Sequence, residues 1–155
     1  MTPVRSKTLW MVAVALALTG CNRQTIYSHY EPVSIEGWAH NDTLTFDTEP
    51  VADAATYSVE AAARVSDAYP YANLALVVRR QAGPDGTLLT DTIHIDVTDA
   101  NGYPMGSGIN HYLHTVRLTD MKLQAGDSLH AEVNHLMSDR QLPGITDVGL
   151  TVRKQ

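Results

Sequence analysis

The chain has 155 residues, a single cysteine and a formal net charge of −6, with 17 acidic side chains against 11 lysines and arginines. This acidic balance argues against nucleic acid as a partner and against electrostatic docking on anionic lipid. One cysteine excludes an intramolecular disulfide bond, so burial of apolar side chains has to hold the fold together.

The N-terminus has the layout of a secretory signal. Arg5 and Lys7 precede an unbroken apolar run from Leu9 to Leu18, which matches the n-region and h-region of a signal peptide. The run is shorter than the roughly 20 apolar residues that a membrane-spanning helix needs. One interpretation is a plain signal peptide cut near Gly20, with Cys21 incidental.

The sequence Leu18-Thr19-Gly20-Cys21 favours a second interpretation. It resembles the bacterial lipobox, at which lipoprotein precursors are cleaved before the cysteine and lipidated on its sulfur. The resemblance implies cleavage after Gly20 and a lipid on Cys21, which also accounts for the leftover thiol. Two or three acyl chains on one residue anchor stably, whereas one chain binds only marginally. We therefore predict a signal peptide at residues 1–20 and a lipidated cysteine with a short tether at residues 21–25.

The rest of the chain is typical of short strands separated by turn residues. Residues 57–65 alternate between apolar and polar side chains, and a period of two predicts a half-buried strand; a helix is the alternative for its alanine-rich centre. The segment Leu74–Arg80, with its run of leucine and β-branched residues, indicates a more buried strand, and residues 87–97 alternate again. Further strands are expected at 26–35 (interrupted at Pro32), 44–46, 112–118, 128–135 and 148–152, with turns at 81–86, 99–102 and 143–144.

About eight strands punctuated by turns predict an all-β fold. The order of the strands favours a single antiparallel β-sandwich over residues 26–155, of jelly-roll or immunoglobulin-like type. In such a fold, alternate side chains of two sheets meet in one core, and each large aliphatic side chain stabilises it by roughly 1.5–3 kcal/mol.

Three separated blocks carry a family resemblance. They are Tyr69-Pro70-Tyr71-Ala72-Asn73-Leu74; Asp91-Thr92-Ile93 followed by Asp99-Ala100-Asn101-Gly102 and Gly106-Ser107-Gly108; and Leu142-Pro143-Gly144-Ile145-Thr146-Asp147-Val148-Gly149-Leu150. In this order behind a lipobox, the set resembles the gliding-motility lipoprotein H (GldH) family of Bacteroidetes. The resemblance implies a non-enzymatic envelope lipoprotein that scaffolds a gliding-associated machinery. One departure is Ser138-Asp139-Arg140, where a basic residue is expected soon after Met137.

The residues that follow Cys21 bear on the location of the lipid. Asn22, Arg23 and Gln24 include no acidic side chain, which is compatible with sorting to the outer membrane. In some Bacteroidetes lipoproteins an acid-containing segment after the cysteine resembles a surface-export signal, and this chain lacks such a segment. We therefore expect a lipid anchor in the outer membrane that faces the periplasm, on a mature chain with nine basic and seventeen acidic side chains.

The sequence contains no catalytic signature. Gly106-Ser107-Gly108 lacks the glycine spacing of a nucleophile elbow. His111 and His114 are three residues apart, and this spacing places them on opposite faces of a strand. We predict no enzymatic activity, no cofactor and no metal.

Two kinds of surface function stay open. A partner-binding or glycan-binding surface would use aromatic and amide side chains, and the candidates are Trp38, Tyr69, Tyr71, Asn73, Tyr103 and Tyr112. O-glycosylation is the other, because three Asp-Ser/Thr-aliphatic triplets resemble the acceptor motif of Bacteroidetes envelope proteins. Thr43 and Ser128 are the better candidates, since they precede strands, whereas Thr92 is expected inside one.

Overall fold

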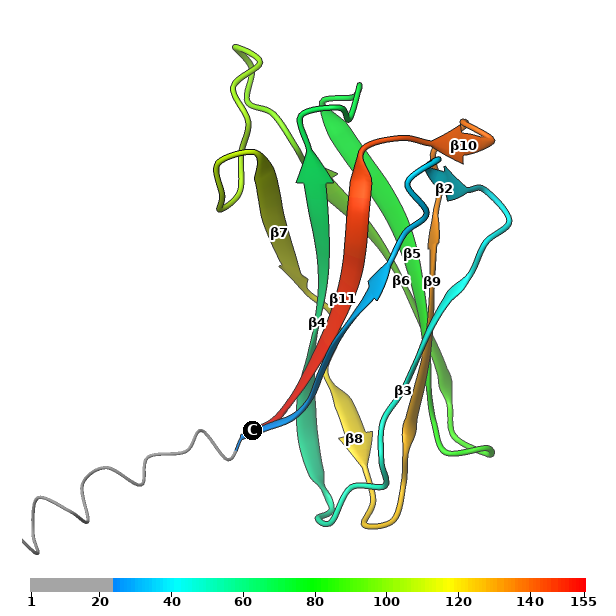
Figure 1. The fold of residues 1–155 in the computed structure, drawn as a ribbon. Helices are drawn as coiled ribbons and strands as arrows, with labels where there is room; N and C mark the ends of the chain where they lie inside the picture. Colours follow the sequence, from blue (N-terminus) through cyan, green and yellow to red (C-terminus); the bar gives the residue numbers. More distant parts are fainter. Residues whose placement is uncertain (1–23) are drawn as a thin grey trace, which may run out of the picture.

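The computed structural model describes residues 24–155, which form two antiparallel β-sheets packed face to face (Figure 1). No helix occurs among these residues, and accordingly none of them forms a helix long and apolar enough to span a membrane. The strands are β1 (Thr25–Pro32), β2 (Trp38–Ala39), β3 (Leu44–Asp47), β4 (Ala55–Ser66), β5 (Asn73–Ala82), β6 (Leu88–Asp96), β7 (His111–Arg117), β8 (Met121–Leu123), β9 (Leu129–His135), β10 (Gln141–Leu142) and β11 (Ile145–Lys154).

The strand order is that of a jelly roll. The first sheet has the order β1-β11-β4-β7, with β8 also paired to β4, and the second has the order β3-β9-β5-β6. The first and last strands of the chain, β1 and β11, therefore pair with each other. Moving inward along the sequence, β3 pairs with β9, β4 with β7 and β5 with β6, as in a long hairpin rolled into a barrel-like sandwich. Of the two topologies that the sequence left open, the jelly roll is the one observed.

The alternation of β4 explains how the first sheet packs. Val59, Ala61 and Ala63 are fully buried on its inner face, opposite Val152, Leu150 and Val148 of β11. On the outer face, Glu60 and Arg64 form ion pairs with partners on β11 at 2.6 Å. The predicted strand at 57–65 is therefore confirmed, together with the side of it that faces the core.

Strand direction divides the loops between two ends of the sandwich. β1 starts at the lower end in Figure 1, beside the end of β11, where the Lys154 backbone N–H donates to the Gln24 carbonyl at 2.7 Å. We call this the tether end; its loops are residues 48–54, 83–87 and 124–128. The opposite, distal end carries the small β2–β10 sheet and the loops at 33–37, 67–72, 97–110, 136–140 and 143–144.

The sequence located the longer strands and missed the short ones. The expected strands at 74–80, 87–97, 112–118, 128–135 and 148–152 correspond to β5, β6, β7, β9 and β11, each within a few residues. β2, β8 and β10 have only two or three residues each. An alternating pattern cannot be recognised in so short a segment. These strands form because they pair with segments that are distant in the sequence.

Candidate functional site

Two of the proposed surface aromatics belong to the core, which corrects the sequence-based expectation. Trp38 is fully buried, and its indole N–H donates to the Asp42 carbonyl at 3.0 Å. Tyr69 is 8% exposed, and its hydroxyl donates to the Asn73 carbonyl at 2.8 Å. Burial raises the pKa of Tyr69 well above its usual range. Neither ring can serve as a stacking platform for a glycan, because neither face reaches the solvent.

The remaining candidates lie at the distal end but do not form one platform. The side chain of Tyr71 is exposed, and its hydroxyl donates to the Asp139 carboxylate at 2.6 Å, so the atypical acid after Met137 has a partner here. That hydrogen bond raises the pKa of Tyr71. Asn73 is exposed at the start of β5, Tyr112 is half-buried on β7, and Tyr103 is 70% exposed on the β6–β7 loop.

Glycines hold the resemblance blocks together at this end. A Cβ atom on Gly144 would lie 2.4 Å from the backbone nitrogen of Tyr69, and Gly144 has φ +81°. Only glycine therefore lets the turn before β11 touch the β4–β5 loop. Gly106 makes a similar approach to His114, with φ +88° and a hypothetical Cβ 2.9 Å from the imidazole ring. Two of the three blocks thus meet directly, and the remaining one packs on the neighbouring strand β7.

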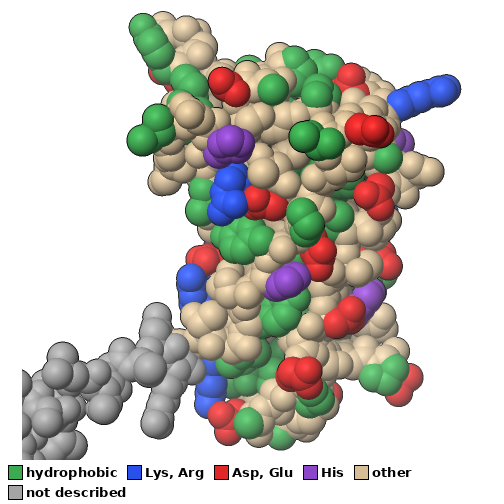
Figure 2. Space-filling view, in the orientation of Figure 1, with side chains coloured by type: hydrophobic (Ala, Val, Ile, Leu, Met, Phe, Trp, Pro, Cys, Tyr) green, Lys and Arg blue, Asp and Glu red, His purple; other side chains and the backbone are tan. Residues whose placement is uncertain are grey.

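The β6–β7 loop is an ordered arm at the distal end. The carboxylate of Asp99 accepts hydrogen bonds from the backbone N–H groups of Asn101 and Tyr103, and Ser107 pairs with Leu113 across the edge of β7. The stretch 100–110 has no charged side chain and is exposed throughout. Figure 2 shows apolar side chains projecting at the upper left, where Figure 1 places this loop. The arm exposes Tyr103, Met105 and Ile109, the last at 85%.

A groove of about 510 Å³ crosses the distal end of the first sheet. Its floor is the start of β11, and its two walls come from the loop after β1 and from the junction of β4 and β7. Ile35 stands on one wall with its side chain fully exposed. The lining residues are Pro32, Val33, Ser34, Ile35, Ser66, Ala68, His111, Gly144, Ile145 and Thr146. None of them carries a permanent charge, so the groove is a mostly apolar surface with a few hydroxyl groups.

A buried ion pair joins the two sheets on the side where β6 faces β7. The Arg80 guanidinium, whose side chain is 0% exposed, pairs with Asp91 on the adjacent strand β6. It also donates to the Thr119 carbonyl at 2.7 Å, and the Thr119 hydroxyl donates to Asp91 at 2.7 Å. Partial burial raises the pKa of Asp91, but the hydrogen bonds from Thr119 and Arg80 and the Arg80 charge outweigh it and leave the pKa lowered. Thr119 follows β7, so this cluster fastens one sheet to the other.

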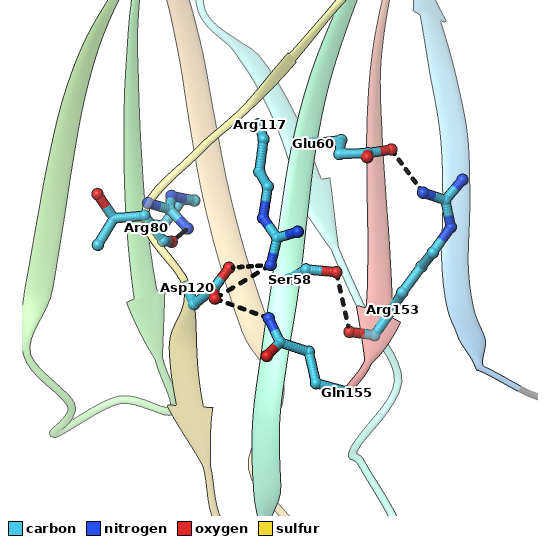
Figure 3. A network of polar contacts seen from close by, with 8 residues as sticks. Ser58, Glu60, Arg80, Arg117, Asp120, Arg153 and Gln155 are labelled. Atoms are coloured by element: carbon cyan, nitrogen blue, oxygen red, sulfur yellow. Dashed lines mark hydrogen bonds and ion pairs between the residues drawn. The ribbon is translucent and has the colours of Figure 1, made fainter.

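A second polar network covers the outer face of the first sheet at its tether half (Figure 3). Arg117 and Gln155 both donate to the carboxylate of Asp120, at 3.1 and 2.7 Å, and Arg153 pairs with Glu60 at 2.6 Å. These side chains satisfy one another, and of them only Asp120 also lines a cavity, one of about 300 Å³ beside β8. Neither network can be recognised from the sequence, because each depends on strand pairings that a local pattern does not reveal.

The histidines differ in burial. His111 is exposed and His114 is buried, as the strand geometry predicts for a spacing of three. Burial lowers the pKa of both His114 and His135, whereas the hydrogen bond that the half-exposed His130 donates to the Asp47 carboxylate raises the pKa of His130. Among residues 24–155, no group of three or more histidine, cysteine or acidic side chains is close enough to hold a metal ion.

The proposed modification sites differ in their exposure. Thr43 is exposed just before β3, and its hydroxyl accepts a hydrogen bond from Asn134 at 2.7 Å. Ser128 is half-buried before β9, and Thr92 is exposed inside the edge strand β6. Cys21 and the cleavage point after Gly20 lie outside the described residues.

Comparisons with known proteins agree on one family. Residues 25–152 match a family described as GldH lipoprotein. Two relatives are each 24% identical: a gliding motility lipoprotein GldH homolog of Christiangramia forsetii, over 90% of both chains, and the gliding motility lipoprotein GldH of Flavobacterium johnsoniae, over 94% of both. Among solved structures, a CBM35 module from Cellvibrio japonicus Abf62 overlaps 83% of this chain and 97% of its own at 12% identity and a TM-score of 0.41. A score of that size carries no argument about binding.

Proposed function

Since this chain belongs to the GldH lipoprotein family, we propose that it is a non-enzymatic lipoprotein that scaffolds a gliding-associated machinery of the cell envelope. In this proposal Cys21 carries the lipid, the outer membrane holds it, and the folded domain faces the periplasm. Support comes from two relatives, which are named as gliding motility lipoproteins and match over nearly their whole length.

The observation that carries the scaffolding role is the distribution of exposed apolar side chains. Of the large apolar side chains that are exposed, most lie at the distal end, and only Ile26 and Leu88 lie toward the tether end. Concentrated apolar exposure on a soluble domain marks surfaces that bind other proteins. The distal set is Ile35, Tyr71, Tyr103, Met105, Ile109 and Leu136.

The short linker between Cys21 and β1 supports a distal end that lies away from the membrane. Three residues lie between Cys21 and Thr25, where β1 starts, so the two are four Cα steps apart, and an extended chain spans at most about 3.6 Å per step. A lipid on Cys21 therefore keeps the tether end within about 14 Å of the membrane. The twelve residues of β4 run for roughly 40 Å, so the apolar loops project that much farther into the aqueous compartment.

The anchor is tested by cell fractionation. Wild-type protein and the Cys21→Ala variant are expressed in the source cells, and membranes are separated by density. We expect wild type in the outer-membrane fraction and Cys21→Ala absent from it, since without the cysteine the chain is neither lipidated nor cleaved at this site. Recovery of Cys21→Ala in the outer-membrane fraction, or removal of the wild-type domain by protease added to whole cells, would count against the proposed placement.

The scaffolding role is tested by site-specific photo-crosslinking in living cells. A photo-reactive amino acid replaces Ile109 at the distal end or Leu88 at the tether end, both of which are well exposed. We expect discrete protein adducts from position 109 and none from position 88. Equal labelling from both positions contradicts the scaffold, as does a deletion strain with neither a gliding defect nor an envelope or secretion defect.

A further inference from the structure

The apolar groove at the distal end is built to receive an extended segment. Its volume of about 510 Å³ falls within the range of about 300–1,000 Å³ that ligand pockets occupy. The floor is closed, because the Gly144 carbonyl already accepts from both the backbone N–H and the hydroxyl of Ser66, and Thr146 accepts from Val33. An occupant therefore gains mainly from apolar contact along the groove.

The charges beside the groove that lack an ion-pair partner among residues 24–155 are acidic. Glu36 follows Ile35 on one wall, and Asp67 lies between two lining residues on the other. Both are exposed, and neither forms an ion pair with any residue in the range 24–155. The nearby cation Arg64 is committed to Asp147. The mature chain has a large excess of acidic side chains, so its overall field also favours a basic partner.

The short tether argues against the anchoring membrane as the ligand of the groove. The groove lies at the far end of strands that run roughly 40 Å, and the short linker after Cys21 holds the other end near the lipid.

We propose that this groove binds an extended apolar segment of a partner protein whose flanks carry lysine or arginine. The proposal rests on the scaffolding function and specifies the chemistry of its contact. Apolar side chains fill the groove beside Ile35, and the basic flanks lie against Glu36 and Asp67. Opposite charges at the rim speed association and select the partner, while apolar burial supplies most of the affinity.

The test is a selection from a random nine-residue peptide library displayed on phage, with the lipidated full-length protein in detergent micelles as bait. Clones that also bind the Ile35→Asp variant are subtracted. We expect the enriched peptides to share an apolar centre with lysine or arginine on both sides. Ile35 is fully exposed, so its replacement leaves the fold intact.

Binding of the most enriched peptide is then measured by fluorescence anisotropy. We expect at least tenfold weaker binding to Ile35→Asp and to the double variant Glu36→Lys/Asp67→Lys, with weaker binding to wild type at high salt. The matched control is Leu88→Asp, an exposed apolar residue at the tether end, which should bind within twofold of wild type.

Several results would overturn the proposal. They are a library with no enrichment over the Ile35→Asp bait, enriched peptides without basic flanks, or equal loss in the Leu88→Asp control. A wild-type dimer that Ile35→Asp converts to monomer would show that a second copy of this chain fills the groove. The selection uses purified protein, so its failure is distinct from a failure of the fractionation and crosslinking experiments that test the scaffold itself.

Discussion

Removing Asp91 should leave the buried Arg80 without its counter-ion and destabilise the domain markedly. Breaking a buried ion pair from one side costs about 3–5 kcal/mol, because the remaining charge stays buried. The Arg80 side chain is 0% exposed, but that of Asp91 is 18% exposed. Water can therefore enter where the carboxylate was, so we expect the lower end of the range, about 3 kcal/mol. For a domain of this size that corresponds to a fall in Tm of about 10 °C.

The assay is urea unfolding of wild type, Asp91→Ala and the double variant Arg80→Leu/Asp91→Val at pH 7. The double variant should recover most of the loss, since an apolar pair in place of a buried ion pair is often neutral or stabilising. A loss below about 1 kcal/mol for Asp91→Ala, or a double variant less stable than the single one, would refute the reasoning.

The Arg80–Asp91 pair also predicts how the free energy of unfolding changes with pH. The folded-state pKa of Asp91 is lowered, so its stabilising contribution is fully present above the unfolded-state pKa of about 3.9. It is lost as the pH falls through that value toward the folded-state pKa. The difference in free energy of unfolding between wild type and Asp91→Ala should therefore shrink from pH 7 to pH 3.

Three further predictions concern stability and are measured by urea or thermal unfolding. Gly144→Ala should lower the free energy of unfolding at least twice as much as Gly126→Ala. Both glycines have positive φ, and this backbone strain alone costs about 1–2 kcal/mol, but an added Cβ would clash with Tyr69 at Gly144 and would meet no atom within 4 Å at Gly126. Equal losses would contradict the close approach. Trp38→Ala should cost about 3–5 kcal/mol, whereas Tyr103→Ala should stay within about 0.5 kcal/mol. Because the folded-state pKa of His114 is lowered, wild type should lose stability relative to His114→Leu as the pH falls from 7 to 5; a constant difference between the two would refute this.

The sequence was sufficient for the fold class because alternation is a local property. In β4 the pattern of small and β-branched residues at every second position predicts which side is buried, and Val59, Ala61 and Ala63 confirm it. The choice of a jelly roll over an immunoglobulin-like order was not available from the sequence, since it depends on pairs such as β1 with β11.

The candidate site was harder to predict because the sequence around an aromatic residue in a polar loop does not show whether its side chain is buried or exposed. Trp38 follows a glycine and precedes a polar stretch, which suggested a surface platform. Its burial depends on Leu142 of β10, more than a hundred residues away, which pairs with it. Arg80 ends an apolar run as though it closed the strand, yet its side chain faces inward to meet Asp91. The groove likewise has no local signature, since its walls come from three separate parts of the chain.

The pairing of β1 with β11 has a mechanical consequence. With the proposed lipid on Cys21 and the proposed partner in the groove, tension would pull on β1 from the tether end and on the start of β11 from the distal end. The load then runs along the axes of two antiparallel strands whose hydrogen bonds are perpendicular to it. From Tyr27 to Pro32 the register is unbroken, so these bonds share the load in shear and do not open one after another. The proposed attachment points thus lie at the two ends of a pair of strands whose geometry resists tension between them.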